Sequence, residues 1–442
     1  MAASKQGKGP IFDSNLRTGR VALVLAFLFA TTIIVVPMQA QTLTVLHNFG
    51  NEGADPGKGI TMDQHLRFYG TTQYGGDLSC GGEQAGGGGP AGCGVVFRLA
   101  NSGSGWVYTP LYDFTSQYSD FPMDPGVPTI APDGSLYDVT YLGGQYDSNG
   151  MVFNLRPSPT RPPSVLSFWN FDSVYQFMGS NDGGGPSPLS PLVFDAQGNI
   201  YGAAGGGVYG YGVVYKLTPS RDGWTQSVLY AFSGCTDGAY PLGITFDNEG
   251  NMYGTTAGAG TPQCGYRGCG TIFELTPTRS GWTETTLYAF RNGIDGCSSG
   301  PAFRDPAGNL YGITIEDGPD NNGGTVWELS PTNGGWTFSV IHAFNFYTVG
   351  WYGPYAPTMD ATGNLWGVVN SGGANDTGML FKLTPTNGGW TFTDAYDFAP
   401  YGGAGSGCFP NGTPLLDASG NFYGVTQLCG LYDEGTLWEF TP

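Results

Sequence analysis

Residues 195–202 read DAQGNIYG, and this stretch decides the fold because close copies of it recur along the chain. Four further copies stand at 247–254 (DNEGNMYG), 305–312 (DPAGNLYG), 360–367 (DATGNLWG) and 417–424 (DASGNFYG). Two degenerate copies precede them at 63–70 (DQHLRFYG) and 131–138 (APDGSLYD), and successive copies start 52 to 68 residues apart. Seven units of this length predict a repeat architecture in which each unit is one supersecondary motif.

Each repeat contains four short β runs, which we call strands A to D. In the third repeat they are 191–195 (PLVFD), 199–204 (NIYGAA), 213–217 (VVYKL) and 224–232 (WTQSVLYAF). The D-x-x-G-N between strands A and B predicts a tight hairpin, because the Asp side chain caps the turn's own backbone and the Gly adopts a positive φ. Four antiparallel strands per repeat are typical of a β-propeller blade.

The two ends of the chain predict that the blades close into a ring. The last repeat ends at 438–442 (WEFTP), which completes strand C but provides no strand D. Residues 45–49 (VLHNF) match the strand D at 228–232 (VLYAF), yet no strand A, B or C precedes them. We therefore predict an all-β fold, a seven-bladed β-propeller of four-stranded antiparallel blades closed by the N-terminal strand, in preference to an open solenoid.

Composition supports this fold and excludes several partners. The chain has 76 Gly and 31 Pro, and only 12% of its residues are charged, against about 25% charged and about 7% Gly in typical domains. A helix-rich fold is disfavoured, because each interior Gly costs a helix about 1 kcal/mol. The net charge of −19 repels nucleic acid and anionic membrane surfaces. Neutral glycans, cations and other proteins remain as partners.

The N-terminus predicts export. Basic residues in the first 20 positions are followed by the apolar run 21–36 (VALVLAFLFATTIIVV) and by the small residue Ala40, which is typical of a secretory signal. We expect residues 1–40 to be a signal peptide; an uncleaved anchor is the alternative, although the run is shorter than the roughly 20 residues of a membrane span. Residues 41–442 then form one propeller domain, a monomer without a further membrane span, which is secreted, periplasmic or at the cell surface.

The repeat resembles a known family. Residues 253–256 (YGTT) and 270–277 (GTIFELTP) are similar to the Gloeo/Verruco (GloVer) tandem repeat, and the resemblance covers residues 43–442. That family comprises exported bacterial proteins with varied surface-anchoring endings, and it implies no particular reaction. Blade 2 departs most from the pattern, because it lacks both the turn Asp and the G-W, and blade 1 lacks the G-N. We expect no anchoring domain after Pro442.

The cysteines gather on one side of the predicted ring. In a propeller the B–C and D–A connections lie on one face, and all eight cysteines fall in these connections; we call this side the cysteine face. An even number of cysteines in an exported protein predicts disulfides. The pairs we favour are Cys80–Cys93, Cys264–Cys269, Cys408–Cys429 and Cys235–Cys297, although sequence alone leaves the connectivity open. A zinc site is disfavoured, because Cys264-x₄-Cys269 lacks a second close pair.

Acidic residues recur in the D–A connections, at Asp55, Asp124, Asp182, Asp237 and Asp295. In a closed ring we expect these carboxylates to encircle the mouth of the central channel on the cysteine face. They predict binding of a hard cation such as Ca²⁺ or of a cationic ligand; the alternative is that they only shape each turn. No other cofactor is expected, because the further acidic cluster, Glu316, Asp317 and Asp320, misses the spacing of a calcium loop.

No catalytic motif stands out. The chain has three His, no G-x-S-x-G and no G-K-[ST] loop, and the five Trp that begin strand D (106, 224, 282, 336 and 390) predict packing between blades. We therefore predict an exported binding protein, in preference to an enzyme, that presents disulfide-braced Gly-rich loops to a glycan or an envelope protein. The alternative is a secreted carbohydrate-active hydrolase or lyase that uses acidic residues on the same face. A structural, matrix-like role is a third reading.

Overall fold

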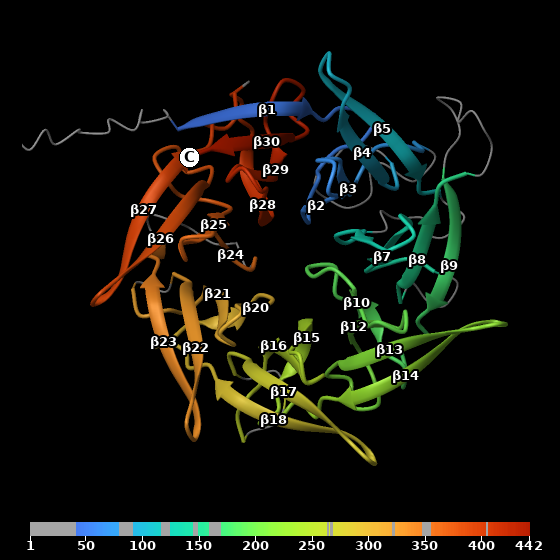
Figure 1. The fold of residues 1–442 in the computed structure, drawn as a ribbon, viewed down its shortest axis with the longest axis vertical. Coiled ribbons are helices and arrows are strands. Elements are labelled where there is room, and N and C mark those ends of the chain that lie inside the picture. The colour runs from blue at the N-terminus through green and yellow to red at the C-terminus, as the bar shows by residue number, and fades with distance from the viewer. Residues whose placement is uncertain are drawn as a thin grey trace, which may run out of the picture. The chain divides into compact units, whose positions relative to one another are not determined.

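The computed structural model describes residues 41–78, 92–115, 124–144, 149–158, 169–262, 265, 268–320, 323–346, 355–403 and 405–442. They belong to one compact unit, Gln41–Pro442. Its strands form seven antiparallel sheets that stand as blades around a common centre (Figure 1). The predicted all-β, seven-bladed propeller is confirmed. No helix in the described part of the chain has the length and apolar character needed to cross a bilayer.

The first four blades are given from the inner strand A to the outer strand D. Blade 1 comprises β2 (Ile60–Met62), β3 (Phe68–Thr72), β4 (Val95–Asn101) and β5 (Trp106–Asp113). Blade 2 comprises β6 (Thr129–Ile130), β7 (Leu136–Thr140), β8 (Met151–Arg156) and β9 (Asn170–Gln176). Blade 3 comprises β10 (Gly184–Pro186), β11 (Val193–Phe194), β12 (Ile200–Gly205), β13 (Val213–Ser220) and β14 (Gly223–Ala231). Blade 4 comprises β15 (Ala239–Phe246), β16 (Met252–Gly258), β17 (Thr271–Thr278) and β18 (Gly281–Ala289).

The last three blades follow the same order. Blade 5 comprises β19 (Cys297–Ser299), β20 (Phe303–Arg304), β21 (Leu310–Glu316), β22 (Thr325–Thr332) and β23 (Gly335–Ala343). Blade 6 comprises β24 (Thr358–Met359), β25 (Leu365–Val369), β26 (Met379–Thr386) and β27 (Gly389–Asp397). Blade 7 comprises β28 (Cys408–Leu416), β29 (Phe422–Leu428), β30 (Thr436–Thr441) and β1 (Thr42–Asn48).

The ring closes through the first strand. β1 pairs antiparallel with β30, from Thr42 opposite Thr441 to Asn48 opposite Thr436, and Figure 1 shows the blue β1 alongside the red β30. The N-terminal strand is therefore the strand D that the last repeat lacks, as the sequence predicts. Closure also gives the last blade a partner for the otherwise open edge of β30.

The A–B hairpins explain why D-x-x-G-N recurs. Asp195 Oδ1 accepts hydrogen bonds of 2.9 Å from the backbone N–H groups of Gln197 and Asn199. Its Oδ2 accepts from Asn199 Nδ2 at 2.6 Å and from the Tyr201 hydroxyl at 2.9 Å. The Asp–Asn contacts recur at the turns of Asp247, Asp305, Asp360 and Asp417. One carboxylate thus fixes the turn and joins it to strand B.

The Gly that ends each motif leaves room for an aromatic side chain of strand C. A Cβ atom at Gly202 would lie 2.5 Å from the Tyr215 hydroxyl, and one at Gly312 would lie 2.3 Å from Trp327. Tyr215 and Trp327 are fully buried, so a larger residue than Gly would displace the centre of the blade. Blade 2 departs from this rule, because Asp138 occupies the Gly position and is itself buried.

The strand-D tryptophans pack between blades. The Trp224 ring centroid lies 6.1 Å from that of Tyr137 in blade 2. Trp336 lies in the same way 5.8 Å from Tyr253 in blade 4. These contacts agree with the inter-blade packing that the sequence predicts for the tryptophans.

Candidate binding site at the channel mouth

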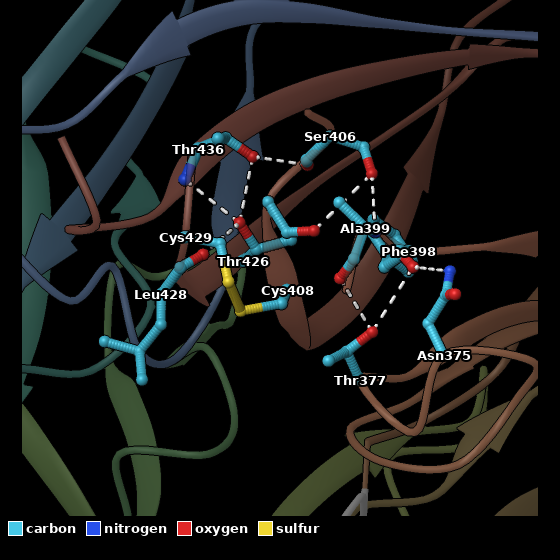
Figure 2. Close-up of a disulfide and its surroundings, with 11 residues drawn as sticks. Asn375, Thr377, Phe398, Ala399, Ser406, Cys408, Thr426, Leu428, Cys429 and Thr436 are labelled. Carbon is cyan, nitrogen blue, oxygen red and sulfur yellow. Dashed lines mark hydrogen bonds between the residues drawn. A yellow bond between two sulfur atoms is a disulfide. The ribbon is translucent and has the colours of Figure 1, made fainter. Parts of the chain in front are cut away.

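The disulfides join connections on the cysteine face. Cys408 is bonded to Cys429, as predicted, and Figure 2 shows this bond beside the hydroxyl groups of Thr426 and Thr436, which lie 2.9 Å apart. The Thr436 hydroxyl also donates to the Ser406 carbonyl at 2.9 Å. Equivalent threonine hydroxyls bond the carbonyls of Asp237 and Asp295. Each of these connections is therefore tied to its own blade.

Two of the expected disulfide pairs are wrong. Cys269 is bonded to Cys297, so neither the Cys264–Cys269 pair nor the Cys235–Cys297 pair forms. The physical reason is the approach of adjacent blades: the Cys269 carbonyl of blade 4 accepts a 3.0 Å hydrogen bond from the Ser298 amide of blade 5, which brings Cys297 next to Cys269.

The remaining cysteines are less fully described. Cys93 and Cys235 are disulfide-bonded. Cys80 and Cys264 lie outside the described residues, and the predicted Cys80–Cys93 pair therefore stays a prediction. Disulfides are typical of proteins in oxidising compartments, so the two bonds that the structure describes suggest such an environment.

Three of the predicted binding aspartates lie inside turns. The Asp237 carboxylate accepts from the Tyr230 hydroxyl at 3.1 Å and from the backbone N–H of Ser233 at 2.7 Å and of Cys235 at 3.2 Å. Asp182 and Asp295 make the same contacts to a tyrosine seven residues earlier and to an amide four residues earlier. All three are buried. We call Asp182, Asp237 and Asp295 the clamp aspartates, because they hold the D–A turn to strand D.

Asp124 occupies a different place in its connection. Six of the D–A connections have a residue in the left-handed backbone region three positions after the place of a clamp aspartate. We call this the mouth position, and it is held by Asp55 (φ 54°), Asp124 (46°), Gly185 (56°), Tyr240 (59°), Ser298 (53°) and Phe409 (58°). The corresponding residue of blade 6 lies outside the described residues.

Neighbouring blades fix the mouth position. The Tyr240 amide donates to the Tyr211 carbonyl of blade 3 at 2.7 Å, and the Phe409 amide donates to the Thr377 carbonyl of blade 6 at 2.7 Å. Left-handed conformations are tolerated by Gly and Asp but are strained for bulky residues such as Tyr and Phe. Strain of this kind persists only where the surroundings enforce it, and it clusters at functional sites. The strained mouth positions therefore indicate a candidate site.

A cavity of about 620 Å³ opens at this place. It is lined by Lys58 of blade 1, Asp124 and Tyr141 of blade 2, Gly185 of blade 3 and Tyr240 of blade 4. A second cavity of about 730 Å³ is lined by inner-strand residues of all seven blades, and it shares Lys58 and Leu189 with the first. The first cavity, which we call the mouth cavity, therefore lies where the cysteine face meets the central channel.

Blade 3 has no side chain at its mouth position, where Gly185 lines the mouth cavity. A Cβ atom at Gly185 would lie 2.8 Å from Cε2 of Tyr141, so the tyrosine ring lies directly against the blade 3 backbone. Gly184, Gly205 and Gly206 also line the cavity. Glycine thus provides both the space and the close approach of the ring.

Titratable groups of blades 1 and 2 lie at or near the mouth cavity. Lys58 Nζ lies 3.2 Å from Asp124 Oδ1. Burial raises the pKa of Asp55 to about 6, although Lys58 and a hydrogen bond from Gln427 oppose the shift. Burial also raises the pKa of Asp138 well above its ordinary value. Of these groups, Lys58 and Asp124 line the mouth cavity, which therefore combines one ammonium group with one carboxyl group.

The predicted cation site has no assembled set of ligands here. Among the residues that the structure describes, no group of three or more His, Cys, Asp or Glu side chains is arranged to hold a metal ion. Of the four predicted binding residues, Asp124 lines the mouth cavity and the three clamp aspartates do not.

Sequence reasoning missed Lys58, Tyr141, Gly185 and Tyr240. One signal for the mouth position is present in the sequence, because a proline follows it in most connections. Pro56, Pro125, Pro186, Pro241 and Pro410 each come directly after a mouth residue. No such signal predicts that Lys58, Tyr141 and Tyr240 line one cavity, because they come from three different blades.

Exposed tyrosines also gather on the cysteine face. Among the described residues the exposed tyrosines are Tyr141 (46% exposed), Tyr209 (60%), Tyr401 (67%) and Tyr432 (60%). All four lie in B–C or D–A connections. This face therefore offers aromatic surface to solvent, whereas the other aromatic side chains are mostly packed within and between the blades.

Comparisons with known proteins agree with the repeat and the fold. The family model described as the Gloeobacter/Verrucomicrobia repeat matches residues 85–301 and 298–442. A search of curated proteins found no match.

Several solved structures are similar to the chain. Polysaccharide lyase Uly1 has 10% identity and a TM-score of 0.48, with 92% of this chain and 94% of that chain covered. A luciferin-regenerating enzyme has 10% identity and a TM-score of 0.41, with 91% and 95% covered. A protein of unknown function from Dyadobacter fermentans has 9% identity and a TM-score of 0.42, with 90% and 96% covered. At such identities and scores the likeness says nothing about activity.

Proposed function

The chain belongs to the Gloeobacter/Verrucomicrobia repeat family, and we propose that it is an exported binding protein whose cysteine face holds a neutral glycan of the cell envelope. The observation that carries this proposal is the exposed aromatic surface: the exposed tyrosines of the described residues, Tyr141, Tyr209, Tyr401 and Tyr432, all belong to this face. Tyrosine is enriched at interfaces, because its ring is apolar and its hydroxyl forms hydrogen bonds.

Tyrosine suits a sugar ligand on physical grounds. The C–H groups on one side of a pyranose pack against an aromatic ring, and the sugar hydroxyls remain free to form hydrogen bonds. A tyrosine side chain offers both an apolar body and a polar tip. The mouth cavity adds an enclosed place of about 620 Å³, a size within the range of small-ligand sites.

Charge favours a ligand without anionic groups. The chain carries a net charge of −19, and a field of this sign repels polyanions. The two described disulfides and the apolar segment 21–36 support export, because disulfides persist in oxidising compartments. An exported propeller meets envelope glycans at high local concentration.

A glycan array tests the proposal. The purified protein is applied to neutral, cationic and anionic oligosaccharides, with and without Ca²⁺, and the released reducing ends are measured in parallel. We expect binding to one or more neutral glycans without release of reducing ends. Binding to no glycan, or a preference for anionic glycans, would overturn the proposal. Binding that EDTA abolishes would revive the cation site predicted from the sequence.

One observation favours a second function, a carbohydrate-active hydrolase or lyase. Asp55, whose pKa burial raises to about 6, lies close enough to Asp124 for their charges to interact, and Asp124 is paired with Lys58. A carboxyl group with a raised pKa beside a second carboxyl group is what acid–base catalysis of glycosidic bonds needs. Release of reducing ends that both Asp55→Asn and Asp124→Asn abolish would establish this function instead of simple binding.

A further inference from the structure

We propose that the mouth cavity is the subsite for one uncharged pyranose ring, which stacks on Tyr141 and hydrogen-bonds through neighbouring hydroxyls to Asp124 and Lys58. The inference rests on the proposed glycan binding and names the place and the chemistry of recognition. Of the four exposed tyrosines, Tyr141 is the one that lines this cavity.

The Tyr141 ring is a supported platform. One side of the ring lies against the Gly185 backbone, where a Cβ atom would approach Cε2 to 2.8 Å. The residue nevertheless remains 46% exposed, so surface is left for a ligand. Because the backbone already limits the ring's freedom, a sugar that stacks on it loses little further side-chain entropy.

The Lys58–Asp124 pair complements two adjacent hydroxyls. The ammonium group has three donors and the carboxylate has about four acceptor positions, so their 3.2 Å contact leaves hydrogen-bonding capacity on both. One sugar hydroxyl donates to Asp124 while its neighbour accepts from Lys58, and such charge-assisted hydrogen bonds are stronger than neutral ones. The pair itself is neutral, which gives an anionic sugar no net attraction.

The remaining walls set the width of the subsite. Tyr240 of blade 4 also lines the cavity and is held at φ 59°. Gly184 and Gly206 approach so closely that a Cβ atom at Gly206 would lie 3.2 Å from the Gly184 nitrogen. Both glycines line the cavity, so these walls are formed by backbone.

Isothermal titration calorimetry on the full chain tests the subsite. The probes are cellohexaose, mannohexaose and xylohexaose, with oligogalacturonate as the anionic comparison. We expect Tyr141→Ala to lower the affinity for the uncharged probe that the wild type binds best by at least about tenfold, the equivalent of 1.4 kcal/mol. Tyr141→Phe keeps the ring, and its affinity for the same probe is expected to stay within about threefold of the wild-type value. Val107→Ala, which removes an exposed apolar side chain from the outer strand β5, is expected to leave binding unchanged.

A second variant keeps the test decisive if Tyr141→Ala does not fold. Asp124→Asn preserves the size of the side chain and is expected to weaken the same probe at least about fivefold, without a change in melting temperature. Wild-type affinity in both Tyr141→Ala and Asp124→Asn would overturn the subsite.

The outcomes separate the subsite from the proposed function. If Tyr432→Ala weakens binding and Tyr141→Ala does not, the glycan lies elsewhere on the cysteine face, so the subsite is wrong and the proposed function stands. If the wild-type protein binds none of the uncharged probes, or prefers oligogalacturonate, both fail.

Discussion

Asp237 and Asp124 both lie in D–A connections, but they differ by three positions in register. Asp237 is buried and accepts hydrogen bonds from the Tyr230 hydroxyl and from two amides of its own turn. Asp124 occupies the mouth position, where it contacts Lys58 and lines the mouth cavity. The sequence suggests one ring of equivalent carboxylates, and the structure separates them. Register, more than residue type or connection, decides whether such an aspartate braces the fold or faces the channel.

The sequence contains a marker that distinguishes the two groups. Each clamp aspartate follows a strand-D tyrosine by seven residues, in the pairs Tyr175–Asp182, Tyr230–Asp237 and Tyr288–Asp295. Where the tyrosine is replaced the spacing differs: His47 Nε2 of β1 lies 3.7 Å from Oε1 of Glu52, which stands three positions before the mouth residue Asp55. Tyr396 of β27 is followed seven residues later by Gly403, so the spacing identifies a clamp only where an aspartate completes it.

The largest expected effect comes from removing a clamp aspartate. Asp237→Ala leaves the Tyr230 hydroxyl and the amides of Ser233 and Cys235 without their acceptor. Buried donors left unpaired cost about 1–3 kcal/mol each, and partial access of water to the turn offsets some of this. We expect the free energy of unfolding to fall by about 3–4 kcal/mol in urea titrations. Asp124→Ala is the matched variant, expected to change it by less than about 1 kcal/mol; equal losses would remove the distinction.

The next largest effect on stability is expected from the disulfide beside the mouth residue Phe409. Cys408 directly precedes Phe409, whereas Ala239 precedes Tyr240 without such a bond. The paired change Cys408→Ser and Cys429→Ser opens a loop of 21 residues and is expected to lower stability by about 3 kcal/mol. Hydrogen exchange provides the internal control: the Phe409 amide should exchange faster in the variant and the Tyr240 amide should not. Faster exchange at both would mean that the bond braces the whole face.

Asp55 gives the mouth positions a distinct pH dependence. Burial raises its pKa to about 6, above the ordinary value, so the folded protein holds more protons than the unfolded chain between about pH 4 and pH 6. Stability from this group is therefore present at low pH and is lost as the pH rises through about 6, by an amount on the order of 2 kcal/mol.

Comparison of the wild type with Asp55→Asn in urea titrations at pH 4, 5, 6 and 7 isolates this group. We expect the free energy of unfolding of Asp55→Asn to show no such decline as the pH rises through about 6. Turn aspartates shift in the opposite sense: burial opposes it, but hydrogen bonds from Asn364, Trp366 and Thr362 lower the pKa of Asp360 to about 2. The turn aspartates contribute equally to the pH dependence of both proteins, so their contribution cancels in the comparison. Parallel pH profiles of the wild type and Asp55→Asn would show that Asp55 is not the source of the decline in stability.

The features predicted correctly from sequence are those that depend on local chemistry or on period. The Asp195 turn needs only residues within six positions of one another, and ring closure follows from counting strands. The Cys269–Cys297 bond and the meeting of Lys58 with Tyr141 depend on how adjacent blades approach. A repeat pattern does not encode that approach, and so the disulfide pairing was only partly predicted and the mouth cavity was missed.

The smallest expected effect tests the clamp from its tyrosine side. Tyr230→Phe removes one hydroxyl donor, while Asp237 keeps its bonds from Ser233 and Cys235. We therefore expect a loss of about 1 kcal/mol in the free energy of unfolding. Tyr396→Phe is the matched control, because Tyr396 occupies the same place on β27 but the residue seven positions later is Gly403, and its loss should stay below about 0.5 kcal/mol.

A double-mutant cycle of Tyr230→Phe with Asp237→Ala then measures the contact itself. We expect a coupling of about 1 kcal/mol, because either change alone breaks the same hydrogen bond and the second has nothing further to break there. Additive losses, or equal losses for Tyr230→Phe and Tyr396→Phe, would mean that the hydroxyl contributes nothing and that the backbone amides alone fix the position of the clamp aspartates.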